Sequence, residues 1–442
     1  MPASQPAPSR TTRARWLRLL GEVALLVVAL AVARSILVAT SRQPTGDVLE
    51  YHTYALNFWT VHPYFTSLPV EYPPLAILPF SLTLAPPLPD YQSVFVWWAT
   101  AAIILGYLGF LRYADRKRAL AYFVYLVLGA IGTVISRFDI FPALVTVAAL
   151  WAAQRRHFAG SSLLLALGTL LKLYPAFLLP ILLIEHWRAL TADAVDARGV
   201  TGWLRAPAAW RVAEGLALFA GVVGLGFAAA AALDPGGALT VFTYASARPL
   251  QVESTPATLL WLGSLVGFPA HPEFSFASLN YVGPLDVILK PLSSVALAAG
   301  CLWAYWRFAR GRLRLAQAFL AVLCVVVVAN KIFSPQYLVW LAPFVAEVYG
   351  FDALWLVICA LTTLIFPYLY SIRDPILTVP YDWAFMPTVA LRNVLLLSFT
   401  LRAILGVAAR RPFARVAGTR PGEAPPDLTP ETSRRVTAPD GV

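Results

Sequence analysis

Charged residues are scarce in this sequence, and their scarcity excludes a soluble fold. Asp, Glu, Lys and Arg together make up 13% of the 442 residues, whereas hydrophobic residues make up 59%. A soluble domain averages about 25% charged and about 45–50% apolar residues. Apolar runs recur along the whole chain. The composition therefore predicts one membrane-embedded unit without a separate soluble domain.

Cysteine and histidine are also rare, and the few present form no recognisable site. Cys301, Cys324 and Cys359 each lie in an apolar run, which indicates packing residues rather than a disulfide framework. None of the five histidines forms a His-x-x-x-His pair or joins a cysteine cluster, so we expect no metal and no other cofactor. A basic groove interleaved with aromatic residues is missing too, so no nucleic acid is expected as a partner.

Basic residues gather in alternate loops, and this pattern orients the chain. The net charge is +11, and a basic cluster precedes the first apolar run. Cytoplasmic loops carry an excess of Lys and Arg. We therefore predict an all-α polytopic protein of the cell membrane with about 12 transmembrane helices and a cytoplasmic N-terminus. The crossings are placed near residues 17–39, 92–111, 119–136, 139–154, 159–171, 174–187, 212–233, 286–306, 315–330, 337–350, 353–370 and 386–408.

The ends of the chain and one internal segment depart from this pattern. Residues 1–15 and 409–442 are polar or Pro-rich and are predicted to be disordered and cytoplasmic, which leaves a transmembrane catalytic domain over 16–408. The Pro-rich segment 73–90 lies in a large first outer loop and is predicted to be interfacial or re-entrant. The crossings 159–171 and 174–187 are short and predict a broken helix pair, with a charged residue at its tip.

Unusual polar residues concentrate in the predicted outer loops. Charged groups at the ends of apolar spans are expensive and indicate function. Cations can hold a lipid-linked phosphate while a carboxylate removes the proton of an acceptor hydroxyl. The candidates for such chemistry are Asp47, His52, Glu71, Tyr72, Lys172, Tyr174, Arg248, Lys331 and Gln336.

Four sequence pieces, in order, resemble a known family. They are Gly46-Asp47, Glu71-Tyr72-Pro73-Pro74, Lys172-Leu173-Tyr174-Pro175 and the segment 334–340, Ser-Pro-Gln-Tyr-Leu-Val-Trp. Together, over roughly residues 20–405, they resemble glycosyltransferase family 87, the polyprenol-phosphate-mannose-dependent mannosyltransferases of the GT-C superfamily. The resemblance implies an active site on the extracytoplasmic side, a polyprenyl-phosphate sugar donor and a lipid, glycan or protein acceptor. It also implies an inverting, metal-independent transfer with Asp47 as the general base. Glu71 is the rival for that role, because it is also acidic and lies in the same loop.

Each candidate residue also has a structural interpretation. Asp47 can be a helix-capping carboxylate, and Glu71 can pair with Arg42 or Arg137. Lys172 either contacts the phosphate or extends to the interface. Arg248 and Lys331 either contact the phosphate or form loop ion pairs. His52 either contacts the acceptor or is an ordinary loop residue.

A membrane transporter or lipid flippase is the alternative function. It predicts internal repeats with broken helices at matching positions of the two halves. The break at 172–175 has no counterpart of the same spacing within 330–405. A purely scaffolding role would leave the carboxylates and cations of the outer loops unexplained.

Overall fold

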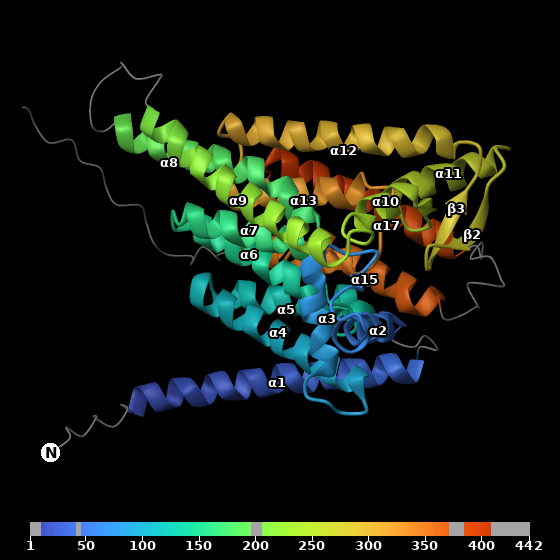
Figure 1. Ribbon diagram of the computed structural model, residues 1–442, viewed down its shortest axis with the longest axis horizontal. Coiled ribbons are helices and arrows are strands. Elements are labelled where there is room, and N and C mark those ends of the chain that lie inside the picture. The colour runs from blue at the N-terminus through green and yellow to red at the C-terminus, as the bar shows by residue number, and fades with distance from the viewer. Residues whose placement is uncertain (1–9, 41–45, 196–205, 371–383, 408–442) are drawn as a thin grey trace, which may run out of the picture. The chain divides into compact units, whose positions relative to one another are not determined.

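The computed structural model describes residues 10–40, 46–195, 206–370 and 384–407, and this part of the chain is predominantly helical (Figure 1). Residues 1–9 and 408–442 lie outside it, and with them most of the two segments predicted to be disordered. Helix α1 (Arg10–Thr40) begins earlier than expected, so residues 10–15 are helical rather than disordered. Good helix formers such as Arg and Ala continue the helix without a stop signal.

Each predicted crossing coincides with a helix. Six helices are long and apolar enough to cross a membrane among the described residues, namely α1, α4, α5, α9, α12 and α17. The protein therefore has the character of an α-helical membrane protein. The helices at the predicted crossings are α1, α4 (Tyr91–Tyr113), α5 (Arg116–Val134), α6 (Ile140–Gln154), α7 (Phe158–Leu171), α8 (Leu179–Val195), α9 (Ala206–Leu233), α12 (Asp286–Ala309), α13 (Leu315–Val328), α14 (Tyr337–Tyr349), α15 (Ala353–Thr363) and α17 (Phe385–Leu405).

Helix starts follow local capping chemistry. The first N–H groups of a helix have no intrahelical partner, and a side-chain oxygen just before the helix can accept from one of them. Asp90 accepts from the Ser93 amide at the start of α4, at 3.1 Å. Asp115 does the same for α5 and Asp352 for α15. These aspartates immediately precede the helices, so their sequence positions fix where the helices begin.

Burial separates interior helices from peripheral ones. Helix α13 is apolar on every side and buried along nearly its whole length, as expected of a helix surrounded by others. It packs against α12, α14 and α17. In contrast, α1, α9 and α12 leave large apolar side chains such as Leu25, Leu225 and Leu302 exposed. Such continuous apolar faces are suited to contact with lipid.

The predicted break between two short helices is present. Helix α7 ends at Leu171, and Lys172 takes an extended backbone conformation. A short 3-10 turn, η3 (Tyr174–Leu178), follows with Pro175 in its first turn and leads into α8. A proline is tolerated at this position because the first N–H groups of a helix have no partner.

The first loop folds into helical pieces. Helix α2 (Gly46–Thr60) is followed by η1 (Pro74–Ala76), α3 (Ile77–Ser81) and η2 (Leu82–Leu84). Helices α2 and α3 lie side by side (Figure 1). Tyr51 stacks on Phe80 with ring centroids 4.2 Å apart, and both rings contact Phe138. The Pro-rich segment predicted to be interfacial or re-entrant is thus a set of short turns anchored by an aromatic cluster.

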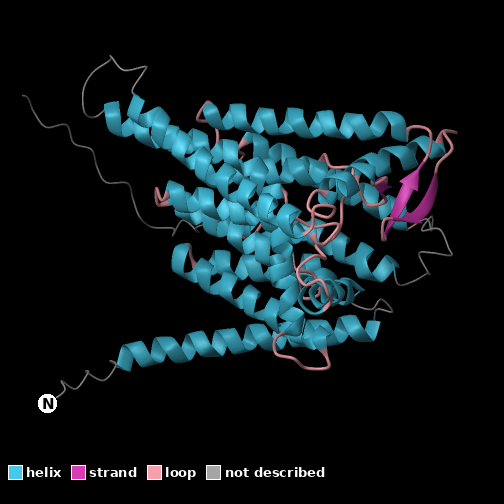
Figure 2. Cartoon of the chain, viewed as in Figure 1, coloured by secondary structure: helices cyan, strands magenta, loops and turns pink. Residues whose placement is uncertain are grey.

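A small antiparallel sheet accompanies the predominantly helical fold (Figure 2). Between α9 and α12 the chain forms α10 (Thr240–Ala247), β1 (Leu250–Gln251), α11 (Thr255–Leu265), β2 (His271–Ser275) and β3 (Ser278–Val282), and the strand order is β1-β3-β2. The hairpin between β2 and β3 turns at Phe276 and Ala277, both with positive φ. Tight hairpins usually place Asn or Gly there. The unusual turn residues gave no sequence signal for the hairpin.

Candidate functional site

The candidate site lies where α6 begins and α7 ends, and we call this the site end of the helices. Six charged residues form what we call the charged cluster: Asp47, Glu50, Glu71, Arg137, Asp139 and Lys172. They come from α2, the segment before η1, the turn before α6 and the turn after α7. Segments far apart in the sequence therefore contribute to one region.

Asp47 lies in the first turn of α2 and forms an ion pair with Arg137. Both side chains are about one-fifth exposed, at 21% and 20%. A carboxylate near a helix N-terminus is also stabilised by the helix dipole. The alternative pairing of Glu71 with Arg137 is wrong for the described residues, in which Arg137 pairs with Asp47 and Glu71 accepts from Tyr244. Arg42, the other predicted partner of Glu71, lies outside the described residues.

Asp139 and Lys172 form a second ion pair of the cluster. Lys172 Nζ lies 2.6 Å from Asp139 Oδ1, and Trp340 Nε1 donates to the same oxygen at 2.6 Å. The Asp139 side chain is almost completely buried, and its Oδ2 has no hydrogen-bond partner in the part of the chain that the structure describes. Asp139 is not among the site residues predicted from the sequence. Its place beside Arg137 in the same outer loop was the available signal.

Lys172 is enclosed by aromatic rings. Its ammonium lies 4.8 Å from the ring centroid of Phe138 and 5.1 Å from that of Trp340. Tyr72 and Tyr337 lie slightly farther away, at 5.6 and 5.9 Å. Burial lowers the pKa of Lys172, and the charge of Asp139 partly opposes that effect. The interpretation in which Lys172 extends to the interface is therefore wrong, because the ammonium is directed into the protein.

Tyr72 and Tyr174 are buried beside Lys172. The Tyr72 ring packs edge-on against Phe138, at 5.2 Å. Tyr174 stacks on Trp340 at 4.4 Å, and its hydroxyl is 3.2 Å from Thr146 Oγ1. These contacts give both tyrosines a packing role at the wall of the site. Their predicted contact with a substrate stays a prediction.

Glu71 and Glu50 form the acidic side of the cluster. Tyr244 on α10 donates its hydroxyl proton to Glu71 Oε1 at 2.8 Å. Burial and the neighbouring charge of Glu71 raise the pKa of Glu50 to about 7. Glu50 is not among the site residues predicted from the sequence, although it lies one helical turn after Asp47 in α2. A carboxyl group that titrates near neutral pH can exchange a proton during a reaction.

Lys331 and Arg248 have different surroundings. Lys331 Nζ donates to the carbonyl oxygens of Ser246 and Arg248, at 2.7 and 2.9 Å. Cations commonly bind the free carbonyls at a helix C-terminus, here that of α10. Arg248 donates to Ser278 Oγ at 2.8 Å, and its Nε is buried without a partner among the described residues. Within those residues neither cation pairs with a carboxylate, so the predicted loop ion pairs are wrong.

His52 and Gln336 are held by local contacts. His52 stacks on Tyr91 at 4.0 Å, and its Nδ1 lies 3.3 Å from Thr83 Oγ1. It therefore joins α2 to the start of α4. Gln336 is buried and accepts a hydrogen bond from Ser334 in the turn before α14. Both residues stabilise the elements that carry the site, and the predicted substrate contacts are not tested by these interactions.

Taken together, the cluster offers carboxylates, two buried or half-buried cations and an aromatic wall. Such a set can bind an anionic group and accept a proton from a hydroxyl. Among the described residues, no group of three or more His, Cys, Asp and Glu side chains is arranged to hold a metal ion. No protein-family model matches the chain, and no curated protein matches it. The chemistry of the site is therefore inferred from its own geometry.

Proposed function

We propose that the protein is an inverting glycosyltransferase that uses a polyprenyl-phosphate sugar. It transfers a mannosyl or related residue to a lipid, glycan or protein acceptor at the outer face of the cell membrane. The observation that carries this proposal is the convergence of Asp47, Arg137, Asp139 and Lys172 at the site end. Three of the four sequence pieces that resemble family 87 contribute residues to the charged cluster, and the fourth contributes Trp340.

The proposal includes a GT-C architecture with about 12 crossings and the site at the outer face. The distribution of basic residues supports this orientation. Arg112 ends α4 and Arg116 begins α5, at the ends of these helices remote from the site. Arg155 and Arg156 follow α6 at the same remote end. Since basic residues favour the cytoplasmic side, the site end would face outward.

The transfer requires one bond to form and one to break. The oxygen of the acceptor hydroxyl attacks the anomeric carbon, and the bond from that carbon to the phosphate oxygen breaks. The hydroxyl proton passes to a carboxylate, for which we propose Asp47. The polyprenyl phosphate leaves with the bonding electron pair. Negative charge therefore grows on the phosphate, and cations placed there stabilise the transition state more than the ground state.

Arg137 and Lys172 are the proposed phosphate-binding cations. Guanidinium groups bind phosphate through paired hydrogen bonds, so an arriving phosphate competes with Asp47 for Arg137. This exchange would free the Asp47 carboxylate as the donor binds. Donor binding would thus prepare the base for the acceptor, which favours an ordered reaction.

The remaining carboxylates are suited to hydroxyl recognition. Asp139 Oδ2 is a buried acceptor without a partner among the described residues, and buried polar groups normally have one. We propose that a sugar hydroxyl of the donor donates to this oxygen. Glu71, held by Tyr244, would face the acceptor side together with Glu50.

The test measures transfer of radiolabelled mannose from polyprenyl-phosphate-mannose by purified protein in nanodiscs. We expect activity in the wild type and a loss of at least about 10²-fold in Asp47→Asn, since general-base catalysis contributes about 10²–10⁴-fold. Asp115→Asn is the matched control. Asp115 caps α5 at the opposite end, and asparagine caps helices equally well.

Two outcomes would contradict parts of the proposal. Equal activity in wild type and Asp47→Asn would transfer the base role to another carboxylate, which Glu50→Gln and Glu71→Gln would then identify. If folded wild-type protein transfers no sugar to any of a panel of lipid, glycan and peptide acceptors, the glycosyltransferase proposal fails. The same nanodiscs would then be assayed for lipid translocation.

A further inference from the structure

Helix α1 is attached to its neighbours by polar contacts at two separate levels. In the first half of α1, Arg116 Nε on α5 donates to Glu22 Oε1 at 2.9 Å, and Tyr107 on α4 donates to the same oxygen. At the site end, Arg34 Nη2 donates to Ser93 Oγ in the first turn of α4, at 3.4 Å. The contacts hold α1 beside α4 at both levels.

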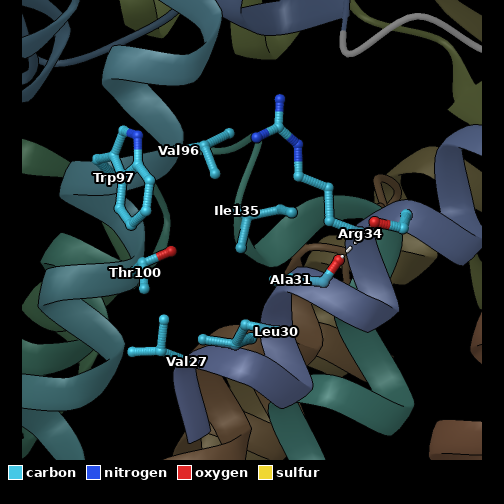
Figure 3. A pocket seen from close by; sticks show the side chains of 9 residues that line it. Val27, Leu30, Ala31, Arg34, Val96, Trp97, Thr100 and Ile135 are labelled. Atoms are coloured by element: carbon cyan, nitrogen blue, oxygen red, sulfur yellow. Dashed lines mark hydrogen bonds between the residues drawn. The ribbon is translucent and has the colours of Figure 1, made fainter. Parts of the chain in front are cut away.

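Between these two levels α1 and α4 leave a cavity of about 520 Å³ (Figure 3). Val27 and Leu30 of α1 lie on one side, Val96 and Thr100 of α4 lie on the other, and Ile135 lies between them. The walls are mostly hydrocarbon. The volume falls within the range of roughly 300–1,000 Å³ that is typical of small-molecule pockets.

Arg34 is the charged residue among those that line the cavity. Asp90, an exposed carboxylate that caps α4 by accepting from the Ser93 amide, lies close enough to interact electrostatically with Arg34. Among the described residues, the Arg34 guanidinium makes one long hydrogen bond, to the Ser93 hydroxyl, and so retains donors for another oxygen ligand. The cavity thus combines an apolar slot with one cation at its end.

The cavity adjoins the charged cluster. Ile135 lies two residues before Arg137, the partner of Asp47. Val96 follows Phe95, whose ring centroid is 5.6 Å from that of Tyr51 on α2. A ligand in the cavity would therefore have its anionic end beside the cluster and its apolar part directed away from it.

From these relationships we infer that the cavity between α1 and α4 binds the isoprenoid chain of a polyprenyl phosphate next to its phosphate, with Arg34 contacting that phosphate. This inference rests on the proposed function and adds the place where the carrier lipid is held. The occupant follows from the match between a single apolar chain with one anionic end and a single apolar slot with one cation. The exposed face of α1 would leave the rest of the chain in the bilayer.

The inference predicts recognition of chain length. A donor with a long prenyl chain fills the slot, whereas a donor with a chain of two isoprene units leaves much of it empty. Burial of apolar surface favours binding of the longer chain. The enzyme should therefore prefer the long donor through KM, while the transfer step itself should depend little on chain length.

The kinetic test fills the slot with a side chain. Ala31 lines the cavity and is exposed, so Ala31→Trp can occupy it without entering a packed core. We expect the KM for the long-chain donor to rise at least about tenfold, towards that of the short-chain donor, whose own KM should rise less because its chain fills less of the slot. Ala29→Trp is the matched control, because Ala29 is exposed on the same helix outside the cavity.

Direct binding is tested with a photoreactive polyprenyl phosphate that carries no sugar. We expect it to label peptides of α1 and α4 in wild-type protein and to label Ala31→Trp at least about tenfold less. Excess unlabelled polyprenyl phosphate should compete, and excess phosphatidylglycerol should not. In Arg34→Gln, which leaves the slot open, labelling should also weaken, because the phosphate contact is lost.

The results separate this inference from the proposed function. Labelling that phosphatidylglycerol removes would identify the cavity as an ordinary lipid site and overturn the inference. If the protein transfers sugar but the probe labels peptides outside α1 and α4, the inference about the cavity is overturned and the proposed function is retained. Specific labelling of α1 and α4 in a protein without transferase activity would support the binding site and count against the proposed function.

Discussion

Asp139 and Lys172 are 33 positions apart in the chain, yet they form a buried ion pair of 2.6 Å at the centre of the candidate site. The tip of a broken helix pair carries the lysine, and the turn before α6 carries the aspartate. Trp340, from a third segment, donates to the same carboxylate oxygen. The pair therefore fixes three segments against one another, while the second carboxylate oxygen of Asp139 is buried and has no partner among the described residues.

Substitutions at Asp139 and Lys172 should have strongly coupled effects on the free energy of unfolding. Lys172→Met leaves Asp139 as a buried charge without a cation, and breaking one side of a buried pair typically costs about 3–5 kcal/mol. The double variant Lys172→Met, Asp139→Asn should recover much of that loss. Thermal unfolding of the four proteins in detergent forms a double-mutant cycle. Additive effects of the two single changes would contradict the coupling.

Glu50 should make stability depend on pH near neutrality. Its pKa is raised to about 7 by burial and by the charge of Glu71. A carboxyl group with a raised folded-state pKa contributes stability that is fully present below its unfolded pKa and is lost as pH rises through the folded value. The thermal unfolding midpoint of the wild type should therefore decrease as the pH rises from about 5 to about 8.

Two variants test this assignment. Glu50→Gln should reduce the fall of the unfolding midpoint and leave a remainder, because Glu253, whose pKa burial also raises to about 7, still titrates. Glu71→Gln should also reduce the decrease of the unfolding midpoint with pH, because removing the neighbouring charge lowers the pKa of Glu50. Glu273→Gln, a change at an exposed position on β2, should keep the wild-type dependence. An unchanged fall in Glu50→Gln would assign the titration to another group.

A second buried ion pair anchors α17. Arg392 and Glu253 are both almost fully buried, with Nη1 3.3 Å from Oε2, and Arg392 Nη2 also donates to the Glu253 carbonyl at 2.8 Å. Arg392→Met should destabilise the protein by about 3–5 kcal/mol, because Glu253 is left buried without a cation. Glu253→Gln should cost less, since an amide oxygen can still accept from Arg392.

Thermal unfolding measures the stability of both variants, Arg392→Met and Glu253→Gln. Arg310→Met is a suitable control, because Arg310 is exposed at the end of α12. A loss in Arg392→Met no larger than that in Arg310→Met would show that the buried pair contributes little. A larger loss of stability in Glu253→Gln than in Arg392→Met would contradict the prediction that the glutamine variant is the less damaged of the two.

The orientation of the site end can be tested by thiol labelling. The native residues Cys301, Cys324 and Cys359 are buried, so background labelling should be low. A cysteine at the exposed Thr60 on α2 should react with an impermeant maleimide in intact cells. Arg310→Cys, at the opposite end, should react only after lysis. The reverse pattern would place the site on the cytoplasmic side and remove the basis for a polyprenyl-phosphate donor acting outside.

Much of the helical framework follows from the sequence alone. Helices buried in lipid or protein require long apolar runs, and capping residues mark where those helices start. Asp90 and Asp115 begin helices for that local reason. The break at Lys172 and Pro175 is equally local, since a charge and a proline interrupt an apolar run. The predicted site residues Asp47, Glu71 and Lys172 were recognisable as charges at the edges of such runs.

Their partners depended on the tertiary structure. The ion pairs Asp47–Arg137 and Asp139–Lys172 join separate loops, and nothing in the local sequence states which carboxylate meets which cation. The β2–β3 hairpin was hidden because its turn uses Phe276 and Ala277, residues that rarely adopt positive φ. The sequence by itself determined where the helices are and which ends carry charge, because those features are local. Only packing decided which charges pair, because pairing depends on distances between segments remote in the chain.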